Sequence, residues 1–320
     1  IFINNSGDVG GAIFFYEGNS EVTNCNFTNN TATTIGGAIA AYEGNVANCS
    51  FTYNSADRGG AVYIYENGEV TNCNFVNNSG NWGGAIAINE DNGKVTNCNF
   101  TNNSGDVGGA IIFYKGNGEV TNCNFINNSG DVGGAIAINE GNVTNCNFTN
   151  NTATTFGGAI AIYEGNVINC NFINNTATED GGAVYIYENV TVTNCNFDNN
   201  TADNGGAIYS TIEFSTADSC IFKTDSDTNV NITILSPTLD VDNFTSSYGS
   251  DDKLTFDLRT NSGIPISDGN ILISVYFKDN DTWVGNYSCL SGEGWTVDLP
   301  AGSYYAIIDT EYAEFQIESN

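Results

Sequence analysis

A tyrosine followed directly by a glutamate recurs along the first two thirds of the sequence, roughly every 24 residues, as in Tyr42-Glu43 and Tyr163-Glu164. Exposed aromatic rings can stack on sugar rings, while neighbouring carboxylates and amides can hydrogen-bond to sugar hydroxyls. The pattern therefore favours non-covalent binding of a glycan or another partner on a repeated, outward-facing surface. The candidate ligand-binding residues are Tyr16, Tyr42, Tyr63, Tyr65, Tyr114, Tyr163, Tyr185, Tyr187 and Tyr209.

A purely structural explanation of the same tyrosines stays open. Rings stacked on neighbouring strands shield a sheet and add contact energy, on the order of 0.2–1 kcal/mol per pair. Asn-x-Ser/Thr tripeptides also recur, which in a secreted protein are acceptor sites for N-linked glycans, although an Asn- and Thr-rich repeat produces them by chance. The candidate glycosylation sites are Asn29, Asn77, Asn102, Asn127, Asn150 and Asn174.

Catalytic chemistry has little support in the composition. The chain contains no histidine, so a Ser/His/Asp or Cys/His nucleophile pair cannot form. Arg58 and Lys115 stand alone at positions where other copies of the repeat carry different residues. We therefore expect no enzymatic activity and no cofactor. Turns such as SGDVGG offer the oxygen ligands that Ca²⁺ prefers, but their spacing matches no known ligand pattern.

The charge balance limits the classes of partner. The 37 acidic residues outnumber the 7 basic ones, which gives a net charge of −30. A chain this acidic repels phosphate backbones and anionic membrane surfaces, so we expect no nucleic-acid partner. The sequence has no apolar run long enough to cross a bilayer as a helix, and we expect no membrane insertion in this segment.

The elements that must position these residues are short strands. Nine Gly pairs, from Gly10-Gly11 to Gly205-Gly206, recur at intervals of 23–26 residues, and nine cysteines from Cys25 to Cys220 keep the same step. The segments between them are rich in turn and strand residues and contain almost no leucine, which excludes a leucine-rich repeat. The pattern predicts an all-β fold, a parallel right-handed β-helix of about nine turns.

Stacking of the turns predicts columns of identical side chains. Alternation turns Cys146, Phe148, Ile136 and Ile138 to the interior, and Ala135, Ala137 and Asn139 outward. The Cα–Cβ bonds of stacked cysteines point in the same direction, which is an unfavourable geometry for disulfides between turns, so we expect free, buried thiols. A second expected column is an Asn ladder at a bend, formed by Asn24, Asn48, Asn72, Asn97, Asn122, Asn145, Asn169 and Asn194.

The repeat becomes irregular after Cys220, and the sequence that follows has the alternating pattern of six or seven β-strands. We therefore predict two domains, a β-helix over residues 1–223 and an immunoglobulin-like β-sandwich over residues 224–320. The first residues, IFINNSGDVGGAI, already belong to the repeat, which is expected of a piece cut from a longer protein.

The pairing of GGAI with FxxN, as from Phe148 to Asn151, resembles the repeat of chlamydial polymorphic outer-membrane proteins. The acidic, Asn- and Thr-rich composition more closely resembles that of adhesin-like surface proteins of methanogenic archaea, in which a β-helix is followed by immunoglobulin-like modules. Residues 262–275 and 294–308 are similar to such modules. The resemblance implies an extracellular, cell-surface location and attachment to glycans or to surface proteins of another cell.

The resulting prediction is a non-catalytic, adhesin-like surface protein. One alternative is a structural stalk or fibre subunit, because an open end of a β-helix favours end-to-end self-association. A more remote alternative is a polysaccharide-active β-helix enzyme. Lyases of this fold resemble one another in using Arg or Lys as the base together with Ca²⁺, and this chain has only two Arg and five Lys.

Overall fold

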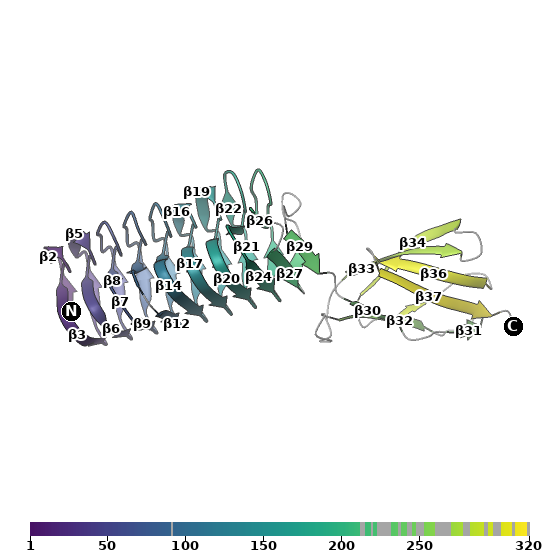
Figure 1. Cartoon of the computed structure of the whole chain (residues 1–320), viewed down its shortest axis with the longest axis horizontal. Helices are drawn as coiled ribbons and strands as arrows, with labels where there is room; N and C mark the ends of the chain where they lie inside the picture. Colours follow the sequence, from purple (N-terminus) through teal and green to yellow (C-terminus); the bar gives the residue numbers. More distant parts are fainter. Residues whose placement is uncertain are drawn as a thin grey trace. The chain divides into compact units, whose positions relative to one another are not determined.

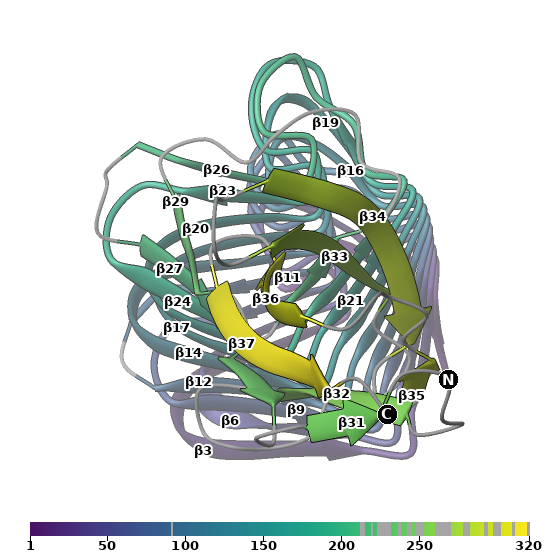
Figure 2. The ribbon, with the colours of Figure 1, turned by 90° about the vertical axis from the view of Figure 1, so that its right-hand side faces the viewer.

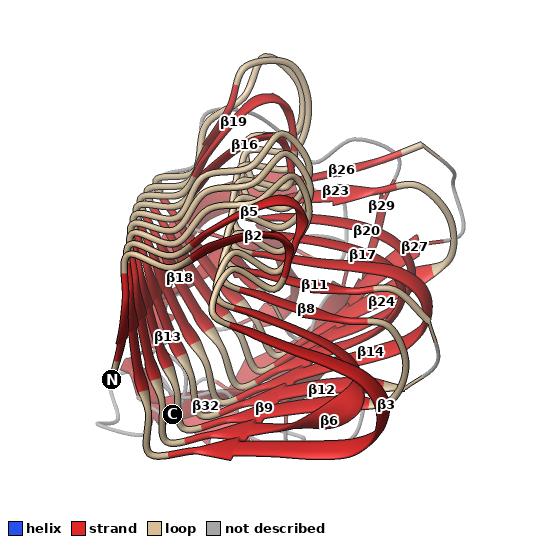
Figure 3. Cartoon of the chain, turned by 90° about the vertical axis from the view of Figure 1, so that its left-hand side faces the viewer, coloured by secondary structure: helices blue, strands red, loops and turns tan. Residues whose placement is uncertain are grey.

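The chain is described from a computed structural model, in which it forms two compact units, Ile1–Thr233 and Ile234–Asn320. The described residues are 1–90, 92–211, 215–218 and 220–222, followed by the nine strands between Ile232 and Glu318. These residues form strands, turns and bends but no helix. Figure 1 shows the first unit as a stack of similar turns, and Figures 2 and 3 show it from its two ends.

The first sheet of the stack is ten strands of two or three residues, each paired in parallel with the equivalent strand of the next turn. Each interior strand presents one completely buried phenylalanine between two outward residues, as period-2 alternation requires. The strands are β1 (Phe2–Ile3), β4 (Asn26–Thr28), β7 (Ser50–Thr52), β10 (Asn74–Val76), β13 (Asn99–Thr101), β15 (Asn124–Ile126), β18 (Asn147–Thr149), β21 (Asn171–Ile173), β25 (Asn196–Asp198) and β28 (Ile221–Phe222).

The second sheet has fourteen strands and carries two half-strands per turn, joined in some turns into one long strand. Ile136 and Ile138 point into the core, whereas Ala137 between them points outward. The strands are β3 (Ile13–Thr23), β6 (Ile39–Ala47), β8 (Val62–Ile64), β9 (Gly68–Thr71), β11 (Ile86–Ile88), β12 (Gly93–Thr96), β14 (Ile111–Thr121), β17 (Ile136–Thr144), β20 (Ile160–Ile168), β23 (Val184–Ile186), β24 (Val190–Thr193), β26 (Ile208–Ser210), β27 (Ser215–Asp218) and β29 (Ile232–Leu235).

A third row of short strands and isolated bridges completes each turn and ends at the Gly pair. Its strands are β2 (Ser6–Val9), β5 (Thr31–Ile35), β16 (Ser129–Val132), β19 (Thr152–Phe156) and β22 (Thr176–Ala177). The following Ala135 lies in the interior cluster, not on the outward face where simple alternation places it, because the chain turns a corner at the glycines.

The Gly pair is required twice over. Gly133 has a φ of 68°, in the left-handed region that L side chains rarely adopt. Gly134 packs against the next turn so closely that a Cβ atom would collide with the carbonyl oxygen of Gly158 and lie 2.6 Å from that of Thr152. Each turn therefore repeats two glycines because one sets the corner and the other admits the neighbouring turn.

The core is built from columns of like residues, as the repeat predicts. From Phe2 to Phe222 the rings stack with centroids 4.8–5.0 Å apart and planes within 3–9° of parallel. This step equals the spacing of hydrogen-bonded strands, so each turn rises by one strand. The nine cysteines from Cys25 to Cys220 are free thiols, and the Cys146 Sγ donates to the Thr144 carbonyl oxygen at 3.3 Å. Burial raises the pKa of the Cys195 thiol well above its ordinary value.

The continuous amide ladder lies at a different asparagine from the expected one. Asn24 and its seven equivalents are at the bend, with φ near +55°, and all eight are exposed. The buried ladder is formed by the asparagine of the FxxN motif. Asn128 Nδ2 donates to Asn151 Oδ1 at 3.0 Å and to the Phe100 carbonyl at 3.1 Å, and the same contacts recur along the stack. Its members are Asn30, Asn54, Asn78, Asn103, Asn128, Asn151, Asn175 and Asn200.

The second unit contains two sheets. One has the order β30 (Thr238–Val241), β32 (Lys253–Arg259), β35 (Gly294–Thr296); the other has the order β31 (Thr245–Ser247), β37 (Glu311–Glu318), β36 (Gly302–Ile308), β33 (Asn270–Phe277), β34 (Thr282–Leu290). Neighbours are antiparallel except β31 and β37. The predicted boundary between residues 223 and 224 lies outside the described residues, and the immunoglobulin-like character of this unit stays a prediction.

Candidate binding groove

Two hollows lie on one outer face of the β-helix, between the second sheet and the third row of strands, and we call this face the groove. Three columns of side chains form it, each with one member per turn. We refer to them as the floor, the tyrosine wall and the loop wall. The floor is the outward residue between the two core-facing residues of each half-strand, and its members are Phe14, Ala40, Tyr63, Ala87, Ile112, Ala137, Ala161, Tyr185 and Tyr209.

The tyrosine wall lies two residues beyond the floor along each turn, so it also faces outward. Tyr42 and Tyr163 are each 41% exposed, and Tyr42 stacks on Tyr65 with ring centroids 5.2 Å apart. Asparagine replaces tyrosine in two turns of this wall. Its members are Tyr16, Tyr42, Tyr65, Asn89, Tyr114, Asn139, Tyr163 and Tyr187.

The loop wall comes from the residue just before each Gly pair. Parallel bridges join successive members, for example Arg58 to Trp82 and Trp82 to Val107. The Trp82 ring lies 5.4 Å from the Tyr114 ring, and the Arg58 guanidinium lies 5.9 Å from the centroid of the same Tyr114 ring. Its members are Val9, Ile35, Arg58, Trp82, Val107, Val132, Phe156, Asp180 and Asn204.

The nine candidate tyrosines therefore divide between two columns. Six of them form the tyrosine wall, whereas Tyr63, Tyr185 and Tyr209 belong to the floor. Tyr63 and Tyr185 point outward from the β-helix as expected but are only 5% and 6% exposed, because the walls pack over them. Phe156, for example, stacks on Tyr185 at 4.7 Å. Alternation along a strand gives the direction of a side chain but not what covers it.

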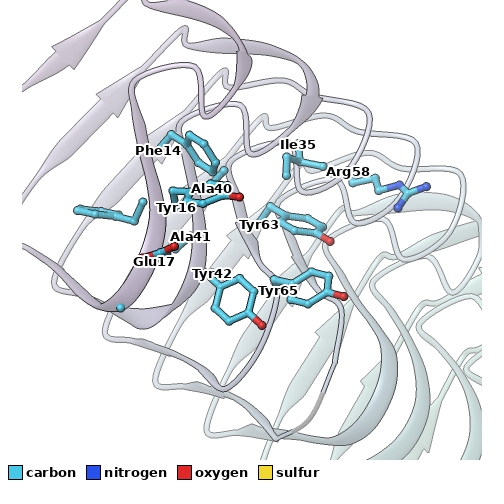
Figure 4. A pocket seen from close by; sticks show the side chains of 12 residues that line it. Phe14, Tyr16, Glu17, Ile35, Ala40, Ala41, Tyr42, Arg58, Tyr63 and Tyr65 are labelled. Atoms are coloured by element: carbon cyan, nitrogen blue, oxygen red, sulfur yellow. The ribbon is translucent and has the colours of Figure 1, made fainter.

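Differences in side-chain size along the floor create hollows. The larger hollow, of about 710 Å³, opens over Ala40, between the bulkier floor residues Phe14 and Tyr63. Tyr16, Tyr42 and Tyr65 form one side and Ile35 and Arg58 the other, as Figure 4 shows. The smaller hollow, of about 190 Å³, opens over Ala137 and Ala161 and is lined by Val107, Val132, Tyr114 and Tyr163 among others.

Glutamates lie level with the hydroxyls of the tyrosine wall. Tyr42 Oη donates to Glu66 Oε1 at 2.8 Å, and Tyr163 Oη donates to Glu188 Oε1 at 3.3 Å. The hydrogen bond to Glu66 raises the pKa of the Tyr42 phenol to about 12. The groove therefore combines flat aromatic surfaces with hydrogen-bond acceptors at two points along one edge, Glu66 and Glu188.

The hydroxyl of Tyr114 is an exception to this pairing. Its oxygen is buried and has no hydrogen-bond partner within the described part of the chain, and Tyr114 is one of the residues that line the smaller hollow. Burial raises the pKa of this phenol, so it stays a neutral donor. A buried hydroxyl without a partner is rare in proteins and unfavourable, which makes it a candidate contact for a bound ligand.

The six candidate glycosylation sites share one position in the turn. Each lies two residues after the core phenylalanine, with a φ between 54° and 56°. All are exposed except Asn77, which is half-buried. They form a column on a different face from the groove, and Tyr53 occupies the equivalent position in one turn.

The aspartates of two of the three SGDVGG turns have structural partners. Asp8 accepts a hydrogen bond from Thr33 at 2.9 Å, and Asp131 accepts one from Thr154 at 2.5 Å, each across to the following turn. Among the described residues, no group of three or more His, Cys, Asp or Glu side chains is arranged as a metal site. The same part of the chain forms no helix of the length and apolarity that crossing a bilayer requires.

Comparison with known families matches two parts of the chain. Residues 11–177, more than half of the 320, match the family described as the right-handed β-helix region. Residues 169–187 and 194–211 match the Chlamydia polymorphic membrane protein repeat. Neither the curated proteins nor the solved structures give a significant match. The predicted right-handed β-helix and its resemblance to this repeat are confirmed, while the archaeal, adhesin-like part of the resemblance stays a prediction.

Proposed function

Because the chain belongs to the right-handed β-helix family, we propose that its stack of turns is a rigid, non-catalytic scaffold that presents the groove at a cell surface for attachment to glycans. The match to the polymorphic membrane protein repeat supports a location at the cell surface or outer membrane. The absence of histidine from the sequence supports a binding role without covalent chemistry.

The observation that carries the proposal is the groove itself. It offers tyrosine rings along one wall, hollows where the floor is alanine, and a buried Tyr114 hydroxyl without a partner. A sugar presents an apolar face that packs on aromatic rings and hydroxyls that can satisfy such a group. An oligosaccharide lying along the groove would contact both hollows through the same wall.

The test is a glycan-array measurement on the fluorescently labelled chain and two variants. The groove variant carries Tyr42→Asn and Tyr163→Asn, which the wall tolerates because Asn89 and Asn139 occupy equivalent positions. The matched control is Tyr53→Asn, which removes an exposed tyrosine from another face, where asparagine is the usual residue. We expect the control to bind glycans as the parent does and the groove variant to lose binding by about tenfold or more. Equal binding by both variants contradicts the proposal.

A structural stalk is the second candidate function, supported by the core columns that continue without interruption from the first turn to the last. In this case the chain would associate end to end through backbone groups of its terminal turns. Sedimentation velocity over a hundredfold range of concentration separates the two candidates. A stalk subunit forms longer species as the concentration rises, whereas an attachment protein keeps one sedimentation coefficient and retains glycans.

A further inference from the structure

We propose that the groove selects glycans that carry amino groups over neutral glycans and over glycans that carry carboxylates. This inference rests on the proposed glycan binding and names the ligand class. Its basis is a column of acids that directly follows the tyrosine wall in the sequence. The members of this acid column are Glu17, Glu43, Glu66, Glu90, Glu140, Glu164 and Glu188, and Lys115 interrupts it in one turn.

The carboxylates of this column lie at the edge of the groove. Hydrogen bonds from Tyr42 to Glu66 and from Tyr163 to Glu188 hold these two carboxylates beside the phenol oxygens. Glu17 itself lines the larger hollow, together with Tyr16 and Tyr42. An ammonium group on a sugar that stacks on the wall would therefore meet a carboxylate and a ring face together, and both contacts favour a cation.

The spacing of the turns makes the acids act together. Successive turns rise by 4.8–5.0 Å, as the phenylalanine column shows. This is less than the Debye length of about 8 Å at physiological ionic strength, so the fields of neighbouring acids add. A chain with one carboxylate per sugar would place a like charge against this column at many turns.

The positive charges near the groove are few and engaged. Of the described basic side chains, Lys115 interrupts the acid column and pairs with its neighbour Glu90 at 3.2 Å. Lys94 lies on a half-strand away from the groove and pairs with Glu119 at 2.9 Å. Arg58 is the basic residue that lines the larger hollow. It lies 3.8 Å from Asp57 and 5.9 Å from the centroid of the Tyr114 ring, so its charge is partly compensated.

The experiment compares three oligosaccharides of equal length by isothermal titration calorimetry. A β-1,4 glucosamine oligomer carries amines, its fully N-acetylated form is neutral on the same backbone, and an oligogalacturonate carries carboxylates. We expect the glucosamine oligomer to bind about tenfold more tightly than its acetylated form at low salt, with an advantage that shrinks as salt is added. The oligogalacturonate should bind most weakly.

Two variants of equal net charge separate the groove from the acidic chain as a whole. Glu43→Gln with Glu66→Gln removes two acids beside the tyrosine wall. Glu21→Gln with Glu69→Gln removes two exposed acids from the other half-strands. We expect the first variant to lose most of the preference for amines and the second to keep it.

Each other outcome overturns a defined statement. Equal loss of the preference in both variants would show general attraction to a polyanion and would overturn the assignment to the groove. Tighter binding of the neutral or the acidic oligomer would overturn the inference while leaving glycan binding in place. Absence of binding to all three oligomers would overturn the proposed glycan binding and this inference with it.

Discussion

The core and the groove are built on the same strands but follow different rules. In the core, the phenylalanine column repeats one residue from Phe2 to Phe222 with a nearly constant ring spacing. On the floor of the groove, equivalent positions carry alanine, isoleucine, phenylalanine or tyrosine. A core column must repeat because a change of size leaves a void or an overlap between turns. Outside, a change of size leaves a hollow that solvent or a ligand can fill, so the proposed binding would gain its specificity from these irregular columns.

The largest expected effect comes from breaking the core column. Phe125→Ala removes a completely buried ring that stacks at 4.8 Å on both Phe100 and Phe148. We expect it to lower the free energy of unfolding by about 3–5 kcal/mol, measured as a shift of the urea midpoint. The partner measurement on the groove is Tyr163→Asn, which should change stability by less than about 0.5 kcal/mol. Similar losses for both would mean that the tyrosine wall is part of the core.

A smaller loss is expected at the amide ladder. Asn128→Ala removes the acceptor of the Asn103 backbone N–H and side-chain amide, and it also removes the hydrogen bond that Asn128 donates to the Phe100 carbonyl, all in a buried position. Unpaired buried groups of this kind destabilise a protein by about 1–3 kcal/mol each. The control is Asn99→Ala, which removes an exposed amide that also bonds to its neighbours, at 2.9–3.0 Å. In the same urea experiment, Asn99→Ala should lower the free energy of unfolding by well under half as much as Asn128→Ala.

A still smaller effect on stability is expected when the groove is filled. Ala40→Tyr places on the floor the residue that Tyr63 and Tyr209 already supply in other turns, so the fold accommodates it. We expect the free energy of unfolding, measured by urea denaturation, to stay within about 0.5 kcal/mol of the parent value while glycan binding in the larger hollow is lost. Retained binding at full affinity would place the ligand elsewhere on the surface.

The smallest effect concerns the titration of a single phenol. Tyr42 has a pKa of about 12, compared with the ordinary value of 10.0, because it donates a hydrogen bond to Glu66. This folded-state value is raised, so the stabilisation is fully present below pH 10 and is lost as the pH rises through about 12. The ultraviolet difference titration between the parent and Tyr42→Phe should show this midpoint. In a Glu66→Gln background the midpoint should move back toward 10, and a parent midpoint near 10 would contradict the hydrogen bond.

The sequence alone was sufficient to predict the columns but not what lies between them. A strict period with one Phe and one Cys per copy predicts the parallel stack, because only in-register turns bring like residues together. The FxxN asparagine carried the signal for the buried ladder, yet the asparagine beside the cysteine was the expected member. Both recur with the same period, but they lie at different bends: Asn24 itself adopts a positive φ and is exposed, whereas Asn30 comes one residue after the positive-φ Asn29 and is buried. The hollows were beyond prediction, since they arise from size differences between Ala40, Tyr63 and their neighbours in adjacent turns.

Hydrogen bonds between turns join residues 23 to 28 positions apart in the chain, so each turn is bonded to the turn before it and the turn after it. The β-helix is therefore a nearly one-dimensional object whose stability is a sum of interfaces between neighbours. Under the proposed attachment role, a pulling force along the stack would act on these interfaces in series and would peel turns away from one end. The turns that remain would keep their section of the groove, so the β-helix would lengthen under load while part of the proposed binding surface stays formed.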